Sequence, residues 1–377
     1  MPKINLLYVI TKLELGGAQR HVLSLIRTLD KERFRLFLFT AQEGLLFEEA
    51  LSIERLQVRK SRYLERPINP VKDILAIFEI KHFIKENDID IVHTHSSKAG
   101  ILGRLAAKLA KARFIVHTVH GWSFNENQPF ILRKIYILLE RFCASFTDKI
   151  VVVSEYDKKI GLNLAIGSRE KFEVVRYGID YKEFNEPKTD GVRKEFGVQE
   201  DELLVGMIGC FKPQKSPLDF LRLANLITKN YKAKFILIGD GVLRKKIEKA
   251  VSRHGLKDKV ILTGWRRDIS CLLSAMDIFT LTSLWEGLPV SVLEAMRLSR
   301  PVIATDTGGI AEVIKQGENG YLVCRKDVSA LAEKLETLLK DPSLRKQIGD
   351  KARDSLGDDF RLENMAAKVK GIYESAR

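Results

Sequence analysis

Cysteine is scarce in this sequence of 377 residues, and the few cysteines form no recognisable pattern. Cys143, Cys210, Cys271 and Cys324 form no CxxC pair and no His/Cys cluster with zinc-ligand spacing. The absence of these patterns argues against a domain stabilised by a structural zinc ion and against a disulfide-rich secreted domain. A reducing compartment such as the cytoplasm fits the cysteine usage.

Long apolar runs are also lacking. No stretch reaches the roughly 20 apolar residues of a membrane-spanning helix. The apolar run at residues 4–10 is typical of a first strand; it is too short for a signal peptide and no small-residue cleavage site follows it. With 45% apolar and 30% charged residues, the chain is expected to be globular and cytoplasmic.

Several binding motifs are missing as well. Leu15-Gly16-Gly17 does not have the GxGxxG spacing, which disfavours an NAD-dependent enzyme. We expect neither a metal ion nor another cofactor. The net charge of +14 favours polyanionic partners, namely nucleotide phosphates, an anionic membrane surface or nucleic acid. A non-catalytic nucleic-acid-binding protein is therefore an alternative, although the sequence has no nucleic-acid-reading motif and no aromatic residues interleaved with its basic clusters.

What the sequence does have is a regular alternation of short apolar runs and amphipathic segments. Residues 89–94, Leu203–Ile208 and Ile278–Leu281 are examples of the apolar runs, and residues 19–29 are an example of the helical pattern. Runs of this kind separated by helices predict βαβ units with parallel sheets. The predicted fold is α/β, with doubly wound sheets buried on both faces.

Two domains are expected for a chain of this length. A polar segment with Pro and Gly at residues 184–197 is the predicted linker, because a fresh βα series starts after it. We predict Rossmann-like domains at residues 1–185 and 186–361, with about 362–377 returning to the first as a helix. Ligands in such folds lie at the carboxyl ends of the strands, so a cleft between the two domains is the expected site.

Two glutamates eight positions apart carry the strongest local signal. Glu286 follows the apolar run Ile278–Leu281, and Glu294 lies in a helix that opens near Pro289. One carboxylate can face a sugar while the other accepts hydrogen bonds from ribose hydroxyls; the alternative is a turn acid and a solvated helix residue. Backbone N–H groups at the helix start can hold a diphosphate. The predicted anion-binding residues there are Gly287, Leu288, Pro289 and Val290.

The segment 283–296 resembles the glutamate-x7-glutamate motif of retaining glycosyltransferases with the GT-B fold, in family four (glycosyl transferases group 1). Residues 177–180 resemble the family's asparagine-glycine-valine-aspartate turn, with Tyr177 in place of asparagine. Further resemblances, in the family's order, are found at residues 15–20, 90–96, 116–121, 239–241 and 307–309. The set covers nearly the whole chain.

The resemblance implies a GT-B enzyme that moves a hexosyl or N-acetylhexosaminyl group from a nucleotide-sugar, most commonly a UDP-sugar, with retention of configuration. It also implies an acceptor bound by the N-terminal half, and a lipid-linked or polysaccharide acceptor is our prediction. An epimerase of sugar nucleotides with the same fold is the alternative. An assay without acceptor separates the two, because only the epimerase turns over.

Glycines and a histidine mark the predicted site in the first half. Gly16 and Gly17 stand between a strand and a helix, where a backbone approaches a ligand closely; a plain tight turn is the alternative. The resemblance implies that this loop contacts the donor's phosphates or the acceptor, and we predict that Gly17 contacts the donor and Gly16 the acceptor. His120 ends a strand before Gly121, and the matching histidine of the family contacts the transferred sugar. A satisfied strand-end histidine is the alternative there.

A strand end at residues 93–96 supplies further candidates. We expect His93 and His95 to face opposite sides of the sheet, which would exclude a two-histidine metal site. His95 and Ser96 are predicted to line the acceptor site.

Lysines mark the predicted site in the second half. Lys215 lies in a loop after the first strand of that half and offers a compact cation for a leaving diphosphate, with a solvated loop lysine as the alternative. The commonest family pattern has arginine where this chain has Cys210. Lys212 is the candidate that supplies the missing charge.

Two segments of the first half bear on the acceptor. Residues 55–66 carry five basic side chains, and residues 130–146 form a very apolar helix with interspersed basic residues. Such a surface favours peripheral contact with the anionic inner face of the cell membrane. The alternative is a core helix and an ordinary solvated basic loop.

Overall fold

The computed structural model describes residues 3–185 and 191–376 and divides into two compact units. The first unit comprises Met1–Gly178 and Leu362–Arg377, and the second comprises Ile179–Arg361. Part of the predicted linker, residues 186–190, lies outside the described residues. The division falls before the predicted boundary at residue 185 because the segment after Gly178 bonds to the second unit. The Ile179 N–H, for example, donates to the Phe360 carbonyl at 2.8 Å.

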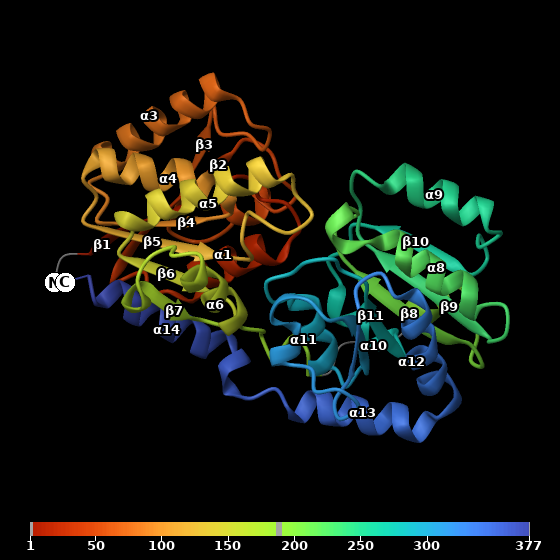
Figure 1. Cartoon of the computed structure of the whole chain (residues 1–377). Helices are drawn as coiled ribbons and strands as arrows, with labels where there is room; N and C mark the ends of the chain where they lie inside the picture. Colours follow the sequence, from red (N-terminus) through yellow and green to blue (C-terminus); the bar gives the residue numbers. More distant parts are fainter. Residues whose placement is uncertain (1–2, 186–190, 377) are drawn as a thin grey trace. The chain divides into compact units, whose positions relative to one another are not determined.

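The described part of the first unit is built on a seven-stranded parallel sheet in the order β3-β2-β1-β4-β5-β6-β7 (Figure 1). Its strands are β1 (Ile4–Val9), β2 (Phe34–Ala41), β3 (Leu56–Ser61), β4 (Ile91–His95), β5 (Phe114–Val119), β6 (Lys149–Val152) and β7 (Phe172–Val174). Its helices are α1 (Gly17–Thr28), α2 (Phe47–Leu51), α3 (Pro70–Glu86), α4 (Ser97–Ala110), α5 (Phe130–Ser145), α6 (Glu155–Asn163) and α14 (Leu362–Glu374).

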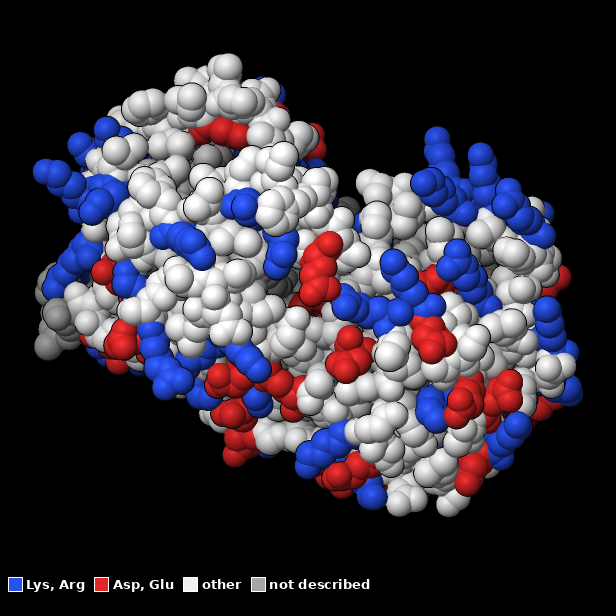
Figure 2. Space-filling model, in the orientation of Figure 1, with Lys and Arg blue, Asp and Glu red and all other residues white. Residues whose placement is uncertain are grey.

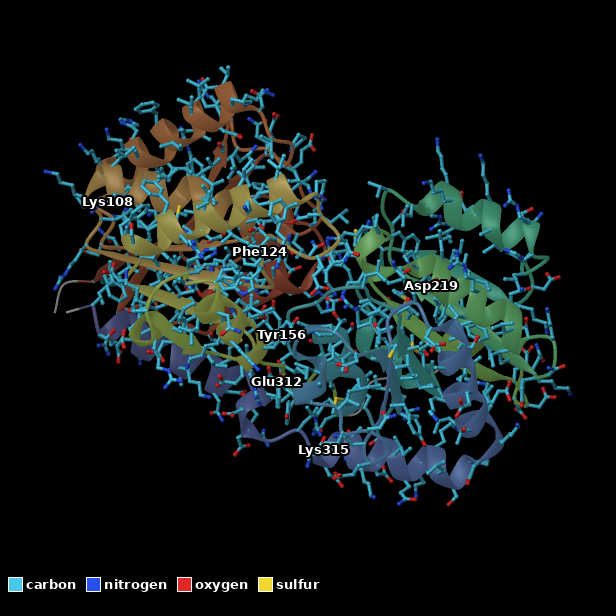
Figure 3. All side chains as sticks on the ribbon, viewed as in Figure 1. Lys108, Phe124, Tyr156, Asp219, Glu312 and Lys315 are labelled. Carbon is cyan, nitrogen blue, oxygen red and sulfur yellow. The ribbon has the colours of Figure 1, made fainter. Side chains whose placement is uncertain are left out.

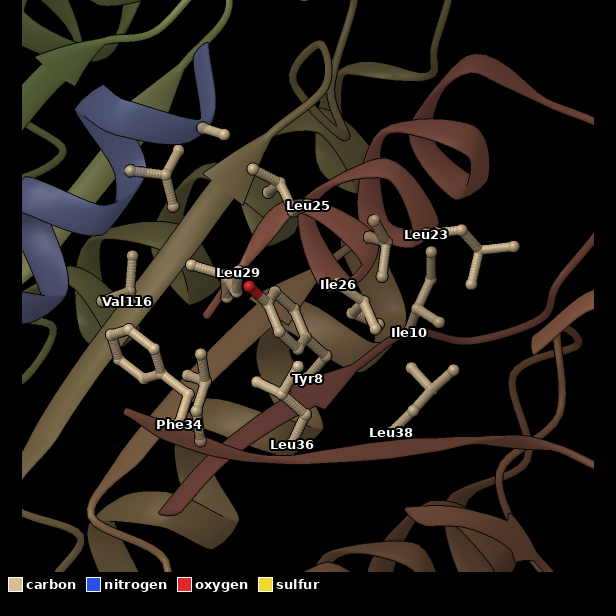
Figure 4. Close-up of a cluster of buried hydrophobic side chains, with 14 of the residues drawn as sticks. Tyr8, Ile10, Leu23, Leu25, Ile26, Leu29, Phe34, Leu36, Leu38 and Val116 are labelled. Atoms are coloured by element: carbon tan, nitrogen blue, oxygen red, sulfur yellow. The ribbon is translucent and has the colours of Figure 1, made fainter. Parts of the chain in front are cut away.

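The core of this unit explains why β1 is an unbroken apolar run. Leu6 and Tyr8 point into a cluster covered by α1 and α14, whereas Leu7 and Val9 point into a second cluster covered by α3 and α4. Figure 4 shows Tyr8 surrounded by aliphatic side chains of α1 and β2. The Tyr8 hydroxyl also lies 2.9 Å from the hydroxyl of Tyr373, which holds the returning helix α14 against the sheet.

The described part of the second unit is a six-stranded parallel sheet in the order β10-β9-β8-β11-β12-β13. Its strands are β8 (Leu203–Ile208), β9 (Ala233–Ile238), β10 (Val260–Gly264), β11 (Ile278–Leu281), β12 (Val302–Thr305) and β13 (Tyr321–Val323). Its helices are α7 (Val192–Glu195), α8 (Pro217–Ile227), α9 (Arg244–Arg253), α10 (Ile269–Ala275), α11 (Val290–Arg297), α12 (Val328–Lys340) and α13 (Pro342–Asp354). Both units therefore have the predicted Rossmann-like form.

Each sheet has one topological switch point, where the strand order reverses. It lies between β1 and β4 in the first unit and between β8 and β11 in the second. Ligands of doubly wound folds bind outside the carboxyl ends of the strands at this point, because the loops there diverge to opposite faces of the sheet. The predicted site residues follow β1, β4, β5, β8 and β11, so each set lies at or beside its switch point.

Candidate active site

An ion pair crosses the switch point of the second unit. Lys215 ends the loop after β8 and Glu286 lies in the loop after β11, and the lysine Nζ is 2.5 Å from Glu286 Oε1. Their side chains are only 16% and 7% exposed, so neither is a freely solvated surface charge. The fold thus brings together two predicted site residues that are 71 positions apart in the chain.

The two loops that carry this pair are joined by hydrogen bonds. The Leu284 N–H donates to the Gln214 carbonyl at 2.7 Å, and the Thr282 hydroxyl donates to the carbonyls of Lys215 at 3.0 Å and Ser216 at 2.9 Å. Because these bonds fix the backbone on both sides, the ion pair is held in place before any ligand binds. Such preorganisation lowers the reorganisation cost of stabilising charge.

Local backbone geometry places Lys215 over the end of β8. Ser216 has φ +44°, a left-handed conformation, and its hydroxyl donates to Asp219 at 2.6 Å in the first turn of α8 (Figure 3). The aliphatic stem of Lys215 runs over Gly209, where a Cβ would lie 3.3 Å from it. A side chain at position 209 would therefore crowd the lysine.

The Thr307-Gly308-Gly309 motif supports the same loop from the other side. Gly308 has φ +61°, and a Cβ there would lie 2.2 Å from the Glu286 carbonyl oxygen. The Gly309 N–H donates to the Gly287 carbonyl at 2.6 Å. Only glycine fits this close approach, so the motif is explained by the packing of the glutamate loop.

Helix α11 begins at Val290 and Pro289 is its N-cap, in agreement with the prediction that a helix opens near Pro289. Within the described residues no side chain caps this helix start, and no acidic residue occupies its first turn. Its free N–H groups and positive dipole end are suited to an anion. Glu294 on the same helix is buried, at 7% exposed, which overturns the alternative that it is a solvated helix residue.

Lys212 lies in the loop that follows β8. It is the N-cap of the short 3-10 turn Pro213–Lys215 and is partly buried, and its N–H donates to the Cys210 carbonyl at 2.8 Å. The lysine and the cysteine thus share one tight turn at the end of β8.

In the first unit, both ring nitrogens of His120 are engaged by other side chains. Nδ1 lies 2.6 Å from the Tyr177 hydroxyl, and Nε2 lies 3.0 Å from Nδ1 of His95. Tyr177 is the residue that stands in place of the family's asparagine. A substrate can hydrogen-bond to the His120 ring only by replacing one of these two partners.

The expectation that His93 and His95 face opposite sides is wrong. Residues two apart in a strand point to the same side, and the two ring centroids are 4.1 Å apart. His93 is satisfied within the protein, since Nδ1 lies 2.6 Å from the Tyr373 hydroxyl and Nε2 lies 2.7 Å from Thr118 Oγ1. It is a structural residue beneath the site.

Sequence reasoning missed a further histidine, His21 on α1. It is buried at 4% exposed, neither ring nitrogen has a partner among the described residues, and its ring centroid lies 5.2 Å from that of His120. His95 Nε2 is also buried without a partner in the described part of the chain. The one sequence signal for His21 was its position one helical turn after Gly17 in the first helix.

Burial keeps these imidazoles neutral. It lowers the pKa of His21 to about 3, and it holds the pKa values of the other buried histidines well below the ordinary value of 6.5. These other buried histidines are His93, His95, His117 and His120, and neighbouring histidines lower their pKa values further.

The switch point of the first unit is held by Ser96, whose φ of 64° and ψ of 159° lie in a region that side chains rarely adopt. Its Oγ lies 2.8 Å from Thr11 Oγ1, so the ends of β4 and β1 are tied together. Gly16 is the N-cap of α1 and Gly17 its first residue. The N-cap residues of α1 and α4 give no side-chain cap, but Thr11 Oγ1 accepts from the Ala99 N–H in the first turn of α4 at 3.1 Å. Backbone strain and two helix starts meet at this point.

Comparison with known proteins shows the same assignment twice along the chain. The family model of glycosyl transferases group 1 matches residues 189–355, and that of Glycosyltransferase Family 4 matches residues 15–183. The UDP-Gal:alpha-D-GlcNAc-diphosphoundecaprenol alpha-1,3-galactosyltransferase of Escherichia coli is 31% identical, over 98% of this chain and 97% of that protein. The chain belongs to glycosyltransferase family four.

Other similarities agree with this glycosyltransferase assignment. An O-antigen biosynthesis glycosyltransferase of Escherichia coli, WbnH, is 28% identical over 98% of both chains. The solved structure of Anabaena Alr3699/HepE in complex with UDP-glucose has a TM-score of 0.86 and 20% identity, covering 99% of this chain and 100% of that one. The fold of the glycosyltransferase is therefore GT-B.

The basic segment at residues 55–66 of the glycosyltransferase is partly neutralised within its own unit. It comprises β3, an edge strand of the sheet, and the loop that follows. Arg55 pairs with Glu32, Arg66 Nη1 lies 3.2 Å from Glu14 Oε2, and Lys60 Nζ lies 4.4 Å from the centre of the Phe47 ring.

Proposed function

We propose that this glycosyltransferase transfers a sugar from a UDP-sugar to a lipid-linked acceptor in glycan biosynthesis, with retention of configuration. The observation that carries the proposal is the partly buried Lys215–Glu286 pair at the second switch point. The relative whose name specifies both a UDP-galactose donor and a diphosphoundecaprenol acceptor supports these two substrate classes. The UDP-glucose complex of the structural neighbour is consistent with the same donor nucleotide.

The donor binds the second unit in this proposal. Glu294 accepts hydrogen bonds from the ribose hydroxyls, and the diphosphate lies against Lys215, Lys212 and the start of α11 at residues 287–290. Gly17 of the first unit contacts the donor as well. Glu286 exchanges its bond with Lys215 for the hydroxyls of the sugar, which frees the ammonium for the phosphate. The positive groups of the chain itself balance the leaving charge, so the proposal includes no metal ion and no other cofactor.

The chemistry follows from where charge develops. The bond between the anomeric carbon and the phosphate oxygen breaks, and a bond from the acceptor oxygen to the same face of that carbon forms. The acceptor proton passes to the leaving phosphate, so no enzyme base is needed. Lys215 and the N–H groups of α11 stabilise the negative charge on that phosphate, which is larger in the transition state than in the bound donor.

The first unit supplies the acceptor side. His120 contacts the transferred sugar, and Gly16, His95 and Ser96 line the acceptor site. Neutral imidazoles suit this role, because they place hydrogen-bonding groups near the reacting sugar without adding positive charge beside a carbon that is itself becoming positive. A lipid-linked acceptor places the enzyme at the inner face of the cell membrane, in the cytoplasm.

The test is a transfer assay with a panel of UDP-sugars and a polyprenyl-diphosphate-linked N-acetylglucosamine, followed by NMR of the anomeric proton of the product. We expect one donor to be used well and the product to keep the donor's configuration. An inverted product would rule out the retaining mechanism, and transfer from other nucleotide-sugars alone would rule out the UDP donor. An incubation without acceptor should yield only slow hydrolysis; conversion of the donor into its epimer would favour the epimerase.

A further inference from the structure

Large apolar side chains are exposed mainly on two helices of the first unit. Those on and just before α3 are Ile68, Val71, Ile74, Leu75 and Phe78, and those on α5 are Phe130, Ile131, Leu132, Ile135, Leu138, Leu139 and Phe142. Several are as exposed as charged surface residues usually are, with Ile131 at 72% and Ile68 at 70%. We call this set, together with Leu109 of α4, the α3–α5 face.

The core does not require the apolar character of this face. Helix α5 buries Glu140, Cys143 and Ala144, a set with little apolar surface. Glu140 is paired with the equally buried Arg104 of α4, at 2.7 Å from Nη2 to Oε2. Residues 131, 135, 138 and 142 have the spacing of one helical stripe, and this stripe points away from the sheet.

The exposed residues of the two helices belong to one surface of the unit. Helix α4 packs against both α3 and α5, and its Leu109 is itself 51% exposed. Figure 2 shows mostly uncharged side chains over α3 and α5, with lysine and arginine among them and at their edges and acidic side chains beside α3. A contiguous apolar surface of this kind on a soluble domain marks an interaction site.

Basic side chains outnumber acidic ones on helices α3, α4 and α5. Asp73 Oδ1 lies 2.5 Å from Lys98 Nζ and Glu79 accepts from the Ser61 hydroxyl at 2.6 Å, whereas Glu86 at the end of α3 is exposed. Three lysines of α3, α4 and α5 lie over aromatic rings, two of them over a ring of their own helix and Lys108 of α4 over Phe146, which follows α5. Lys134 Nζ is 4.4 Å from the centre of the Phe130 ring, Lys81 Nζ is 5.8 Å from that of Phe78 and Lys108 Nζ (Figure 3) is 5.9 Å from that of Phe146.

We propose that the α3–α5 face docks this enzyme on an anionic lipid bilayer, with the apolar stripe inserted at the level of the headgroups. Lysines whose stems lie along apolar side chains can keep their ammonium groups at the lipid phosphates while the rings enter the acyl region. A protein partner would need matching acidic groups at fixed positions, whereas anionic lipid supplies them at every position. The inference rests on the proposed function, because it names the surface by which a lipid-linked acceptor would be reached.

The position of α5 in the chain fits this role. The loop at residues 121–129 runs directly from His120 to Phe130, the first residue of α5. An acceptor whose lipid stays in the bilayer beside α5 would therefore have its sugar presented to the same unit that carries the histidine cluster. Among the described residues, no helix has the length and apolar character that crossing a bilayer requires.

The experiment is co-sedimentation of the full chain with sucrose-loaded vesicles of phosphatidylglycerol and phosphatidylcholine, or of phosphatidylcholine alone. The apolar test variant is Ile135→Ser/Leu138→Ser/Phe142→Ser, and its control is Leu45→Ser/Leu51→Ser/Val242→Ser, which changes three residues that are also exposed. We expect binding to the anionic vesicles that weakens with salt. The test variant should bind at least about tenfold more weakly, because it loses apolar surface that the bilayer would bury, and the control should bind within about twofold of wild type.

A second matched pair of variants tests the contribution of the basic side chains to vesicle binding. Lys81→Gln/Lys108→Gln/Lys134→Gln removes three cations from the face, and Lys245→Gln/Lys246→Gln/Lys249→Gln removes three exposed ones from α9, whose basic side chains stand out in Figure 2. The first should bind anionic vesicles at least about tenfold more weakly, because three cations are lost from the lipid-facing surface. The second should stay within about threefold of wild type.

Several results would overturn the inference. They are a wild-type chain that does not sediment with anionic vesicles, an apolar test variant that binds as wild type does, and two lysine variants that lose binding equally, which would leave only net charge. If sedimentation velocity shows a dimer for wild type and a monomer for the apolar test variant, while vesicle binding is unchanged, the face would instead bind a second copy of the chain. Vesicle binding as expected without transfer to any acceptor would refute the proposed function and leave the docking face standing.

Discussion

Nδ1 of His120 lies 2.6 Å from the hydroxyl of Tyr177, which is close enough to fix the orientation of the imidazole. The two rings are parallel to within 5°, and His95 completes the chain at the other nitrogen. If the tyrosine donates to Nδ1, the proton of neutral His120 is on Nε2 and points to His95. The tyrosine hydroxyl thus sets which nitrogen can meet a substrate.

Replacing Tyr177 by phenylalanine should therefore lower transfer without weakening donor binding. The ring packing is kept, but His120 loses the partner that orients it, and we expect kcat to fall about tenfold, equivalent to about 1.4 kcal/mol. Steady-state kinetics together with UDP titration by calorimetry provide the check. Tyr156→Phe, at an exposed residue of α6, is the control. A kcat equal to that of wild type would show that the hydroxyl has no positioning role.

Replacing Lys215 by glutamine should lower kcat by about 10²–10³, because a cation aimed at the leaving phosphate is lost from a partly buried site. The UDP affinity should fall as well, since the product carries the same diphosphate. Lys257→Gln changes an exposed lysine of the same unit and should leave both quantities within about twofold. Equal kinetics of Lys215→Gln and wild type would contradict the phosphate role.

The partner glutamate should behave differently. Glu286→Gln removes the ion pair but keeps the size of the side chain, and we place Glu286 at the sugar and not at the phosphate. We therefore expect a fall in kcat of at least about tenfold while the Kd of UDP stays within about threefold, because Lys215 remains free to bind the diphosphate. A larger loss of UDP affinity than of kcat would move Glu286 to the nucleotide.

Glu294 is expected to act in donor binding alone. Glu294→Ala removes a charged hydrogen-bond acceptor from the proposed ribose site, which costs about 1.5–3 kcal/mol, or about 10- to 150-fold in the Kd of UDP. Calorimetry with UDP and with uridine should show the same loss for both, since both carry the ribose. Glu248→Ala on the exposed side of α9 is the control. A loss seen with UDP but not with uridine would place Glu294 elsewhere.

The buried histidines predict that the first unit loses stability in acid. Their pKa values are lowered in the folded protein, so above about pH 6.5 neither the folded nor the unfolded state binds protons at these sites and they contribute nothing to the pH dependence. Below about pH 6.5 the unfolded state takes up protons that the folded state does not. The free energy of unfolding should therefore fall by up to about 1.4 kcal/mol per pH unit for each histidine.

His21 separates this effect from general acid denaturation. Its imidazole is buried without a partner, so His21→Met should raise the free energy of unfolding at pH 5 relative to wild type and make the acid slope shallower. Urea unfolding at pH 5 and pH 8 is the measurement. His82→Gln, at a residue whose side chain is 80% exposed, should leave the slope as it is. An acid slope unchanged in His21→Met would mean that this imidazole is protonated in the folded protein.

The sequence by itself determined the architecture of this protein. Unbroken apolar runs such as Leu203–Ile208 are buried on both faces of a sheet, and only parallel strands covered by helices do this, so the two Rossmann-like domains were predictable. The family could be identified for a similar reason, because its motifs follow strand ends in a set order. Our geometric error at His93 and His95 came from misapplying the two-residue period of a strand, which places residues two apart on the same side, and not from missing information.

Only the tertiary structure decided which side chains meet. The contact between Lys215 and Glu286 depends on β8 and β11 lying side by side, and sheet order is not written in local sequence. The burial of His21 beside His120 and the outward direction of the apolar stripe on α5 were equally hidden, because an amphipathic pattern shows that a face is apolar but not what covers it. Local propensity and periodicity act over a few residues, whereas the site is made by loops that only the folded sheets bring together.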